Sequence, residues 1–138
     1  MIETSSHLER LSSAAKPTVF VVDDDAAVLG SLRFLLETDG FAVRTFRGAT
    51  ALLNARGAPR ADCYVIDYKL PDINGIELAG RLRKSDRDTP VILITGYPDE
   101  NISMRAAAAG VKDVVLKPLL DESLVKLIRS AIQDGRGS

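Results

Sequence analysis

The segment Thr18–Asp25 reads TVFVVDDD and joins an apolar run to three consecutive acids. The run is rich in β-branched residues and has the length of a strand. It does not alternate between apolar and polar residues, which is typical of a strand covered on both faces. We therefore expect a buried strand that ends at a group of carboxylates.

Four more runs of strand length follow, at 41–46, 63–66, 91–95 and 111–116. In the segment after the first strand, the apolar residues fall on one face of a helix: Val28, Leu32, Leu35 and Leu36. Four further segments show helical periodicity: 49–56, 75–84, 102–109 and 122–133. Gly40 and Gly110 stand where helix C-caps are expected. Five alternating strands and helices predict an α/β fold, a doubly wound, five-stranded parallel sheet in a three-layer sandwich.

The composition excludes several classes of protein. Among 138 residues, 18 Lys and Arg stand against 19 Asp and Glu, so the net charge is −1 and direct nucleic-acid binding is not expected. The single cysteine, Cys63, allows no internal disulfide and fits a reducing compartment. No apolar run approaches the roughly 20 residues of a membrane span, and the chain starts with no basic-then-apolar leader. We expect one cytoplasmic domain that does not contact a membrane.

The expected domain lies between two tails. Residues 1–16 form an N-terminal tail, in which Ser6 and Glu9 have the capping-box spacing of a short helix. His7, the only histidine, lies in this tail and is expected to be a solvated bystander. Residues 17–133 form the domain, and residues 134–138 form a C-terminal tail.

Polar residues stand where the expected strands end. Three acids at 23–25 follow the first strand, Asp67 follows the third, Thr95 ends the fourth and Lys117 follows the fifth. The carboxyl ends of parallel strands meet at one edge of a sheet, where ligands bind. Crowded carboxylates without His or Cys favour Mg²⁺, and Lys and Thr suit phosphoryl oxygens. The residues therefore predict a Mg²⁺-dependent site in which an aspartate is phosphorylated.

Each of these residues alone has a simpler interpretation. Acids after a strand are often helix N-caps, and Asp25 is expected to cap a helix that starts at Ala26. A threonine at a strand end often packs or caps, and a lysine before a proline is often a solvated loop residue. Their joint placement at four strand ends favours the chemical interpretation.

Four short motifs in order resemble the receiver domain of two-component response regulators. They are VVDDD at 21–25, VIDYKLPDING at 65–75, ILITG at 92–96 and LKPL at 116–119. The resemblance covers roughly residues 17–133 and implies a (βα)5 flavodoxin-like fold. It also implies a phosphorelay signalling protein that takes part in its own phosphorylation and dephosphorylation and is not a turnover enzyme.

The resemblance implies a role for each residue around the acids. Asp67 would accept a phosphoryl group from a phosphohistidine of a sensor histidine kinase or a histidine phosphotransfer protein. Asp24 and Asp67 would bind Mg²⁺ (or Mn²⁺) directly with the backbone carbonyl of Lys69, and Asp23 would act through water.

The same resemblance assigns residues to the phosphoryl group and to switching. Lys117 and Thr95 would bind the phosphoryl oxygens, and the Lys117–Pro118 bond would be a cis peptide that aims Lys117 into the site. Pro71 and Gly75 would shape the loop behind Asp67. Phosphorylation would draw in Thr95 and change the face formed by the fourth helix, fifth strand and fifth helix of the fold.

One position departs from the family pattern. Receivers usually carry a Tyr or Phe three residues before the site lysine, where the ring swings inward with the threonine; here that residue is Val114. Tyr97, two residues after Thr95, is the nearest candidate to take over part of the switch. Lys69 and Tyr97 also flank the expected path of water to the phosphoryl group, which predicts a long-lived phosphoaspartate.

Two other classes of protein fit less well. A phosphatase of the haloacid-dehalogenase type needs an Asp two residues after its nucleophile, and Lys69 occupies that position. A flavin-binding module would not place three acids at its phosphate loop.

Within the family, a single-domain regulator is favoured, and the alternative is a receiver cut from a longer DNA-binding regulator. The run Ala106–Ala109 on the fourth helix could support a homodimer through the switching face, although alanine is also simply a good helix former.

Overall fold

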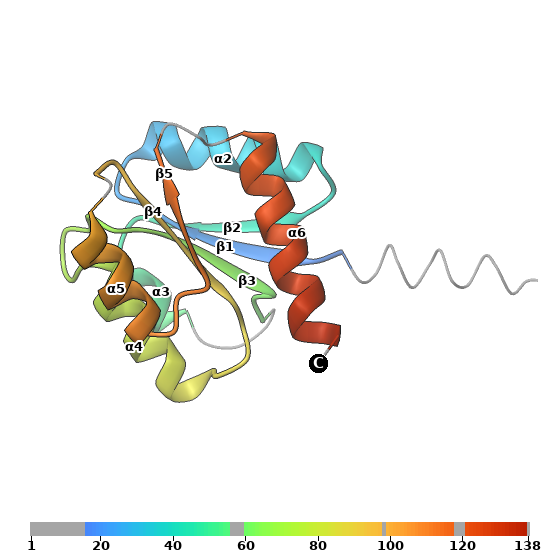
Figure 1. Cartoon of the computed structure of the whole chain (residues 1–138). Helices are drawn as coiled ribbons and strands as arrows, with labels where there is room; N and C mark the ends of the chain where they lie inside the picture. Colours follow the sequence, from blue (N-terminus) through green and yellow to red (C-terminus); the bar gives the residue numbers. More distant parts are fainter. Residues whose placement is uncertain (1–15, 56–59, 98, 118–120, 138) are drawn as a thin grey trace, which may run out of the picture.

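The computed structural model describes residues 16–55, 60–97, 99–117 and 121–137. Its five strands form one parallel sheet in the order β2-β1-β3-β4-β5 (Figure 1). This confirms the expected doubly wound, flavodoxin-like α/β fold. Ser6, His7 and Glu9 of the expected tail and Pro118 of the expected cis peptide lie outside the described residues.

The strands are short, and a helix follows each of them in the chain. The strands are β1 Thr18–Val22, β2 Ala42–Phe46, β3 Cys63–Asp67, β4 Val91–Thr95 and β5 Asp113–Leu116. The helices are α2 Ala26–Thr38, α3 Ala49–Asn54, α4 Gly75–Ser85, α5 Glu100–Ala108 and α6 Glu122–Gly137. Within these bounds α6 continues beyond Gln133 into residues expected as a tail, and there Asp134 forms an ion pair with Lys112, 3.2 Å apart.

Phe41 and Val111, expected as first residues of their strands, belong instead to helix ends. Phe41 donates its N–H to Leu36 at the end of α2, and Val111 donates to Ala106 at the end of α5. The glycines before them, Gly40 and Gly110, have φ of 96° and 89°, as the C-cap expectation requires. Because these N–H groups satisfy helix carbonyls, the strand ladders start one or two residues later.

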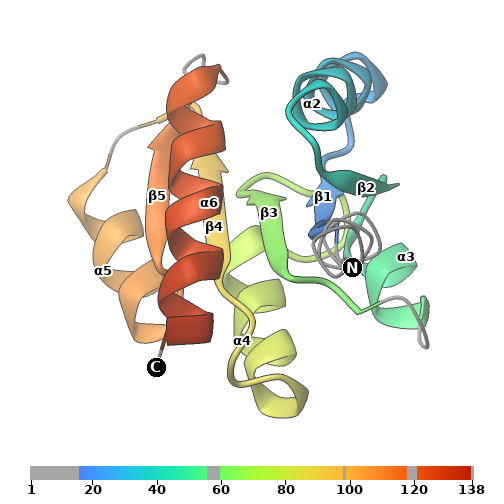
Figure 2. The ribbon, with the colours of Figure 1, turned by 90° about the vertical axis from the view of Figure 1, so that its right-hand side faces the viewer.

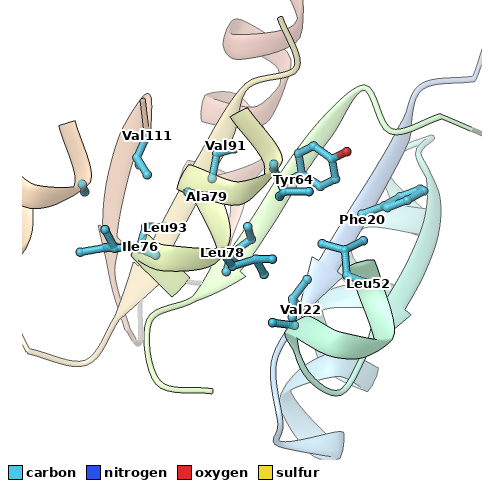
Figure 3. Close-up of a cluster of buried hydrophobic side chains, with 14 of the residues drawn as sticks. Phe20, Val22, Leu52, Tyr64, Ile76, Leu78, Ala79, Val91, Leu93 and Val111 are labelled. Atoms are coloured by element: carbon cyan, nitrogen blue, oxygen red, sulfur yellow. The ribbon is translucent and has the colours of Figure 1, made fainter. Parts of the chain in front are cut away.

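Two apolar layers sandwich the sheet, with α2 and α6 on one side and α3, α4 and α5 on the other (Figures 1 and 2). Along β1, Val19 and Val21 face the α2 and α6 layer, whereas Phe20 and Val22 face the other. Figure 3 shows the second layer, in which Leu52 of α3 and Leu78 of α4 cover the sheet. Burial on both faces explains why β1, β3 and β4 are almost continuously apolar. No helix in the described parts of the chain has the length and apolarity to cross a membrane.

Candidate functional site

The carboxyl ends of four strands meet around a cavity of about 400 Å³. Asp23 follows β1, Asp67 ends β3, Thr95 ends β4 and Lys117 follows β5; all four residues line the cavity. The parallel register sets this convergence, because Thr95 lies opposite Leu116 and Asp67 opposite Ile94 in neighbouring strands. The residues expected at the strand ends are therefore brought together.

A single ammonium group bridges two buried carboxylates in this cavity. Lys117 Nζ lies 3.2 Å from Asp67 Oδ1 and 3.4 Å from Asp23 Oδ2. Asp23 is 1% exposed and Asp67 is 5% exposed. Asp23 Oδ1 accepts a hydrogen bond from the backbone N–H of Asp25, 2.9 Å away, but Oδ2 has no hydrogen-bond partner among the described residues. This buried oxygen is available to a ligand.

The acid cluster can hold a metal ion. Asp23, Asp24 and Asp67 each offer a carboxylate oxygen, and these oxygens lie within 4.8 Å of one another. Hard oxygen donors without nitrogen or sulfur suit Mg²⁺. Asp23 Oδ2 has the ion pair with Lys117 but no hydrogen bond, and the carboxylates outnumber the ammonium group that faces them; both features fit a divalent cation there.

Burial and mutual repulsion change the acidity of the cluster. Burial, reinforced by the charge of Asp23, raises the pKa of Asp67 to about 6, against the opposing attraction of Lys117. Burial likewise raises the pKa of Asp23. Burial alone would lower the pKa of Lys117, but the attraction of Asp67 and Asp23 outweighs it and raises that pKa. The single positive charge of Lys117 therefore does not balance the negative charge of the carboxylates, whereas an added metal cation would.

Asp67→Asn is expected to change the pH dependence of stability in metal-free protein. The pKa of Asp67 rises from an ordinary 3.8 to about 6 on folding, so the folded state binds this proton more tightly. The resulting stabilisation is complete below the ordinary pKa and is lost as pH rises through the folded pKa. The wild-type free energy of unfolding, minus that of the variant, should fall by up to about 3 kcal/mol over this window. Urea denaturation in chelator would measure it, and a constant or rising difference would contradict the assigned pKa.

The third acid has the structural role expected for it. Asp25 accepts hydrogen bonds from the backbone N–H groups of Ala27 and Val28, at 2.9 and 3.3 Å, and caps α2. The three consecutive acids thus have different environments. Asp23 is buried, Asp24 is exposed in the cavity and Asp25 holds the helix.

Thr95 connects the acidic cavity to a neighbouring groove. Its Oγ1 accepts from the Tyr97 N–H at 3.2 Å and donates to the Tyr97 carbonyl at 3.4 Å. Tyr97 is 62% exposed, and its ring centre lies 4.7 Å from Lys69 Nζ at the rim of the acidic cavity. Val114 instead lines a groove of about 550 Å³ between α5 and β5, which Thr95 also lines. The two candidate switch residues therefore lie on different sides of Thr95.

In the loop after Asp67, Gly75 was expected to shape the chain, whereas Asp72 had no expected role. Asp72 accepts hydrogen bonds from the start of α3, although the motif containing it suggested no partner. Gly75 is so close to the backbone of Asp67 that a Cβ would overlap the Asp67 carbonyl oxygen and lie 2.8 Å from Leu93 Cδ1. The contacts of Asp72 depend on where α3 lies relative to this loop, and no local sequence pattern indicates that position.

Comparison with known proteins matches residues 19–129 to the family model described as the response regulator receiver domain. The chain is 37% identical over 118 residues to "Transcriptional regulatory protein FixJ" of Bradyrhizobium diazoefficiens, covering 86% of the chain and 58% of the relative. It is 30% identical over 126 residues to "Response regulator protein TodT" of Pseudomonas putida, covering 91% and 55%. The chain thus spans a little over half the length of these relatives.

Solved structures of similar proteins share the fold. A CheY-like receiver domain protein of Methanospirillum hungatei superposes with a TM-score of 0.84 at 27% identity, covering 89% of this chain and 98% of the other. The receiver domain titled "BeF3 Activated DrrB Receiver Domain" superposes with a TM-score of 0.79 at 29% identity, covering 86% and 98%.

Proposed function

This chain belongs to the response regulator receiver family, and on that premise we propose that Asp67 is its phosphoacceptor. A carboxylate oxygen of Asp67 attacks the phosphorus of a phosphohistidine, the P–N bond breaks, and the imidazole takes the electron pair. The observation that carries the proposal is the placement of Lys117 Nζ 3.2 Å from Asp67 Oδ1, at the strand edge where Asp23 and Asp24 also gather. The donor is a sensor histidine kinase or a histidine phosphotransfer protein.

The surrounding residues supply positioning and charge, which phosphoryl transfer chiefly requires. Asp24, Asp67 and the Lys69 carbonyl would hold Mg²⁺ (or Mn²⁺), with Asp23 acting through water, and the bound ion would supply positive charge against the phosphoryl oxygens. Lys117 binds one of these oxygens. Lys69 stands two residues after Asp67, where a phosphatase of the haloacid-dehalogenase type needs an Asp, and this supports a signalling phosphoacceptor over a turnover enzyme.

The test is the intact mass of the protein after incubation with acetyl phosphate, with and without Mg²⁺. We expect the mass of one phosphoryl group to be gained only when Mg²⁺ is present. No gain, together with no spectroscopic response to beryllofluoride and Mg²⁺, would contradict the proposal.

The proposed conformational switch of this chain uses Thr95. It lacks the usual aromatic side chain at position 114, where the residue is Val114. When the Thr95 hydroxyl turns to the phosphoryl group, its two hydrogen bonds with the Tyr97 backbone are lost. This frees the start of the connection to α5 and alters the face formed by α5, β5 and α6. The same face is the proposed homodimer surface, and Ala107 and Ala108 of α5 are exposed.

Tyr97 and Lys69 are proposed to shield the phosphoryl group from water. The Lys69 ammonium lies 4.7 Å from the Tyr97 ring centre, so the two side chains together cover part of the cavity rim. Tyr97→Ala should therefore shorten the lifetime of the phosphoaspartate several-fold. Decay of the mass adduct after removal of acetyl phosphate measures this, and equal lifetimes in variant and wild type would remove the shielding role.

A second candidate function is that of the receiver part of a longer DNA-binding regulator. One observation favours it: the chain covers 58% of the FixJ relative and 27% of "C4-dicarboxylate transport transcriptional regulatory protein DctD" of Rhizobium meliloti. The receiver itself makes no contact with nucleic acid or membrane in either proposal. The mass of the native protein in its source cells separates the two, since a single-domain regulator has a mass of 14.9 kDa.

A further inference from the structure

The loop from Tyr68 to Gly75, which follows the phosphoacceptor, is anchored at its base and at its tip. At the base, the Gly75 N–H donates to the Tyr68 carbonyl at 2.8 Å. At the tip, the side chain of Asp72 reaches Ala49 at the start of α3, 23 positions earlier in the chain. Lys69, whose carbonyl is the proposed metal ligand, lies between the two anchors.

Asp72 uses both carboxylate oxygens. Oδ1 accepts from the backbone N–H groups of Ala49 at 3.2 Å and Ile73 at 3.0 Å. Oδ2 accepts from the backbone N–H and the hydroxyl of Thr50, each at 2.7 Å. These hydrogen bonds, those from Thr50 above all, hold the pKa of the Asp72 carboxyl well below its usual range.

The start of α3 has no capping side chain of its own. Its N-cap residue is Gly48, which makes no side-chain hydrogen bond. A Cβ on Gly48 would lie 3.5 Å from both oxygens of Asp72, so the two segments are in close contact. Asp72 therefore supplies the N-terminal acceptor of α3 from a distant part of the chain.

We propose that Asp72 is a positioning residue for the metal site, fixing the loop so that the Lys69 carbonyl is held toward the carboxylates before the cation binds. The inference rests on the proposed function, since it presumes the Asp23, Asp24 and Asp67 site. A loop fixed in advance loses less conformational freedom when the ion binds. Residues that orient metal ligands typically affect metal affinity by 10–100-fold. With a backbone ligand we expect the lower end, about tenfold.

The experiment is a Mg²⁺ titration of the full chain at constant ionic strength, by calorimetry, with thermal unfolding measured on each variant. Asp72→Ala should raise the Kd for Mg²⁺ about tenfold. Thr50→Val, which removes one hydroxyl from the same contact, should raise it by a smaller factor and keeps the test available if Asp72→Ala does not fold.

Two controls separate positioning from charge and from stability. Asp72→Asn loses the charge but keeps one acceptor oxygen, so its Kd should lie between those of wild type and Asp72→Ala. Asp86→Ala removes an equal charge and the turn hydrogen bond to the Thr89 N–H, at the opposite edge of the sheet, and should leave the Kd unchanged.

Wild-type affinity in Asp72→Ala would overturn the inference and leave the metal site standing. Equal Kd values for Asp72→Asn and Asp72→Ala, or a matching loss in Asp86→Ala, would also overturn it, because charge or stability would then explain the effect. Wild-type protein that does not bind Mg²⁺ would overturn the metal site itself, and the inference with it.

Discussion

Asp67→Asn protein is expected to gain no phosphoryl mass from acetyl phosphate and Mg²⁺, under conditions that label the wild type. The amide lacks the carboxylate oxygen that attacks phosphorus, so the loss should be complete within the background of the measurement. The fold should persist, because Asn has nearly the same shape and the buried cluster loses one of its repelling charges. Circular dichroism on the same samples checks this.

Asp62→Asn is the matched control for this prediction. Asp62 also flanks β3, but at its start, where its carboxylate accepts from the Thr18 N–H at 2.8 Å. Asp62 therefore lies at the amino ends of the strands, away from the acidic cavity at their carboxyl ends. The Asp62→Asn variant should gain phosphoryl mass like the wild type. Residual Mg²⁺-dependent labelling of Asp67→Asn would mean that another side chain accepts the phosphoryl group.

Gly75→Ala is expected to destabilise the protein by more than about 2 kcal/mol, the range of an overpacked core. The added methyl would overlap the Asp67 carbonyl oxygen, a backbone atom that cannot turn aside, and would lie 2.8 Å from Leu93 Cδ1. Relief of the overlap must displace the end of β3, so phosphorylation should slow as well. Urea denaturation and the rate of mass gain measure the two effects.

Gly80→Ala is its matched control on the same helix. A Cβ at Gly80 meets nothing within 4 Å. Alanine in an open helix interior should therefore raise the free energy of unfolding by about 0.5–1 kcal/mol. If Gly75→Ala also stabilised the protein, this would contradict the close contact between the start of α4 and the backbone of Asp67.

Much of the fold follows from the sequence because its strongest signals are local. The apolar runs and the helical periodicity predict each strand and helix to within a few residues, and Asp25 is recognisable as a helix cap. The convergence of Asp67, Thr95 and Lys117 also follows, because parallel strands place their carboxyl ends at one edge.

The remaining features depend on contacts between distant segments. Phe41 and Val111 look like strand residues, but the preceding helices use their N–H groups. Asp72 looks like an ordinary loop acid, and only the position of α3 gives it its partners. Likewise, composition could not indicate that Tyr97 would contact Lys69 while Val114 lines a separate groove.

Trapping the acyl phosphate with borohydride identifies which residue carries the phosphoryl group, and we propose that this residue is Asp67. Hydride reduces the phosphorylated carboxyl to an alcohol and releases phosphate, so the labelled aspartate becomes homoserine. Trypsin cleavage after Arg60 and Lys69 gives a peptide with two acids, Asp62 and Asp67, which fragmentation distinguishes. We expect homoserine at position 67 only when Mg²⁺ was present. Homoserine at position 62 or at one of the acids 23–25, or no homoserine in protein that has gained phosphoryl mass, would contradict it.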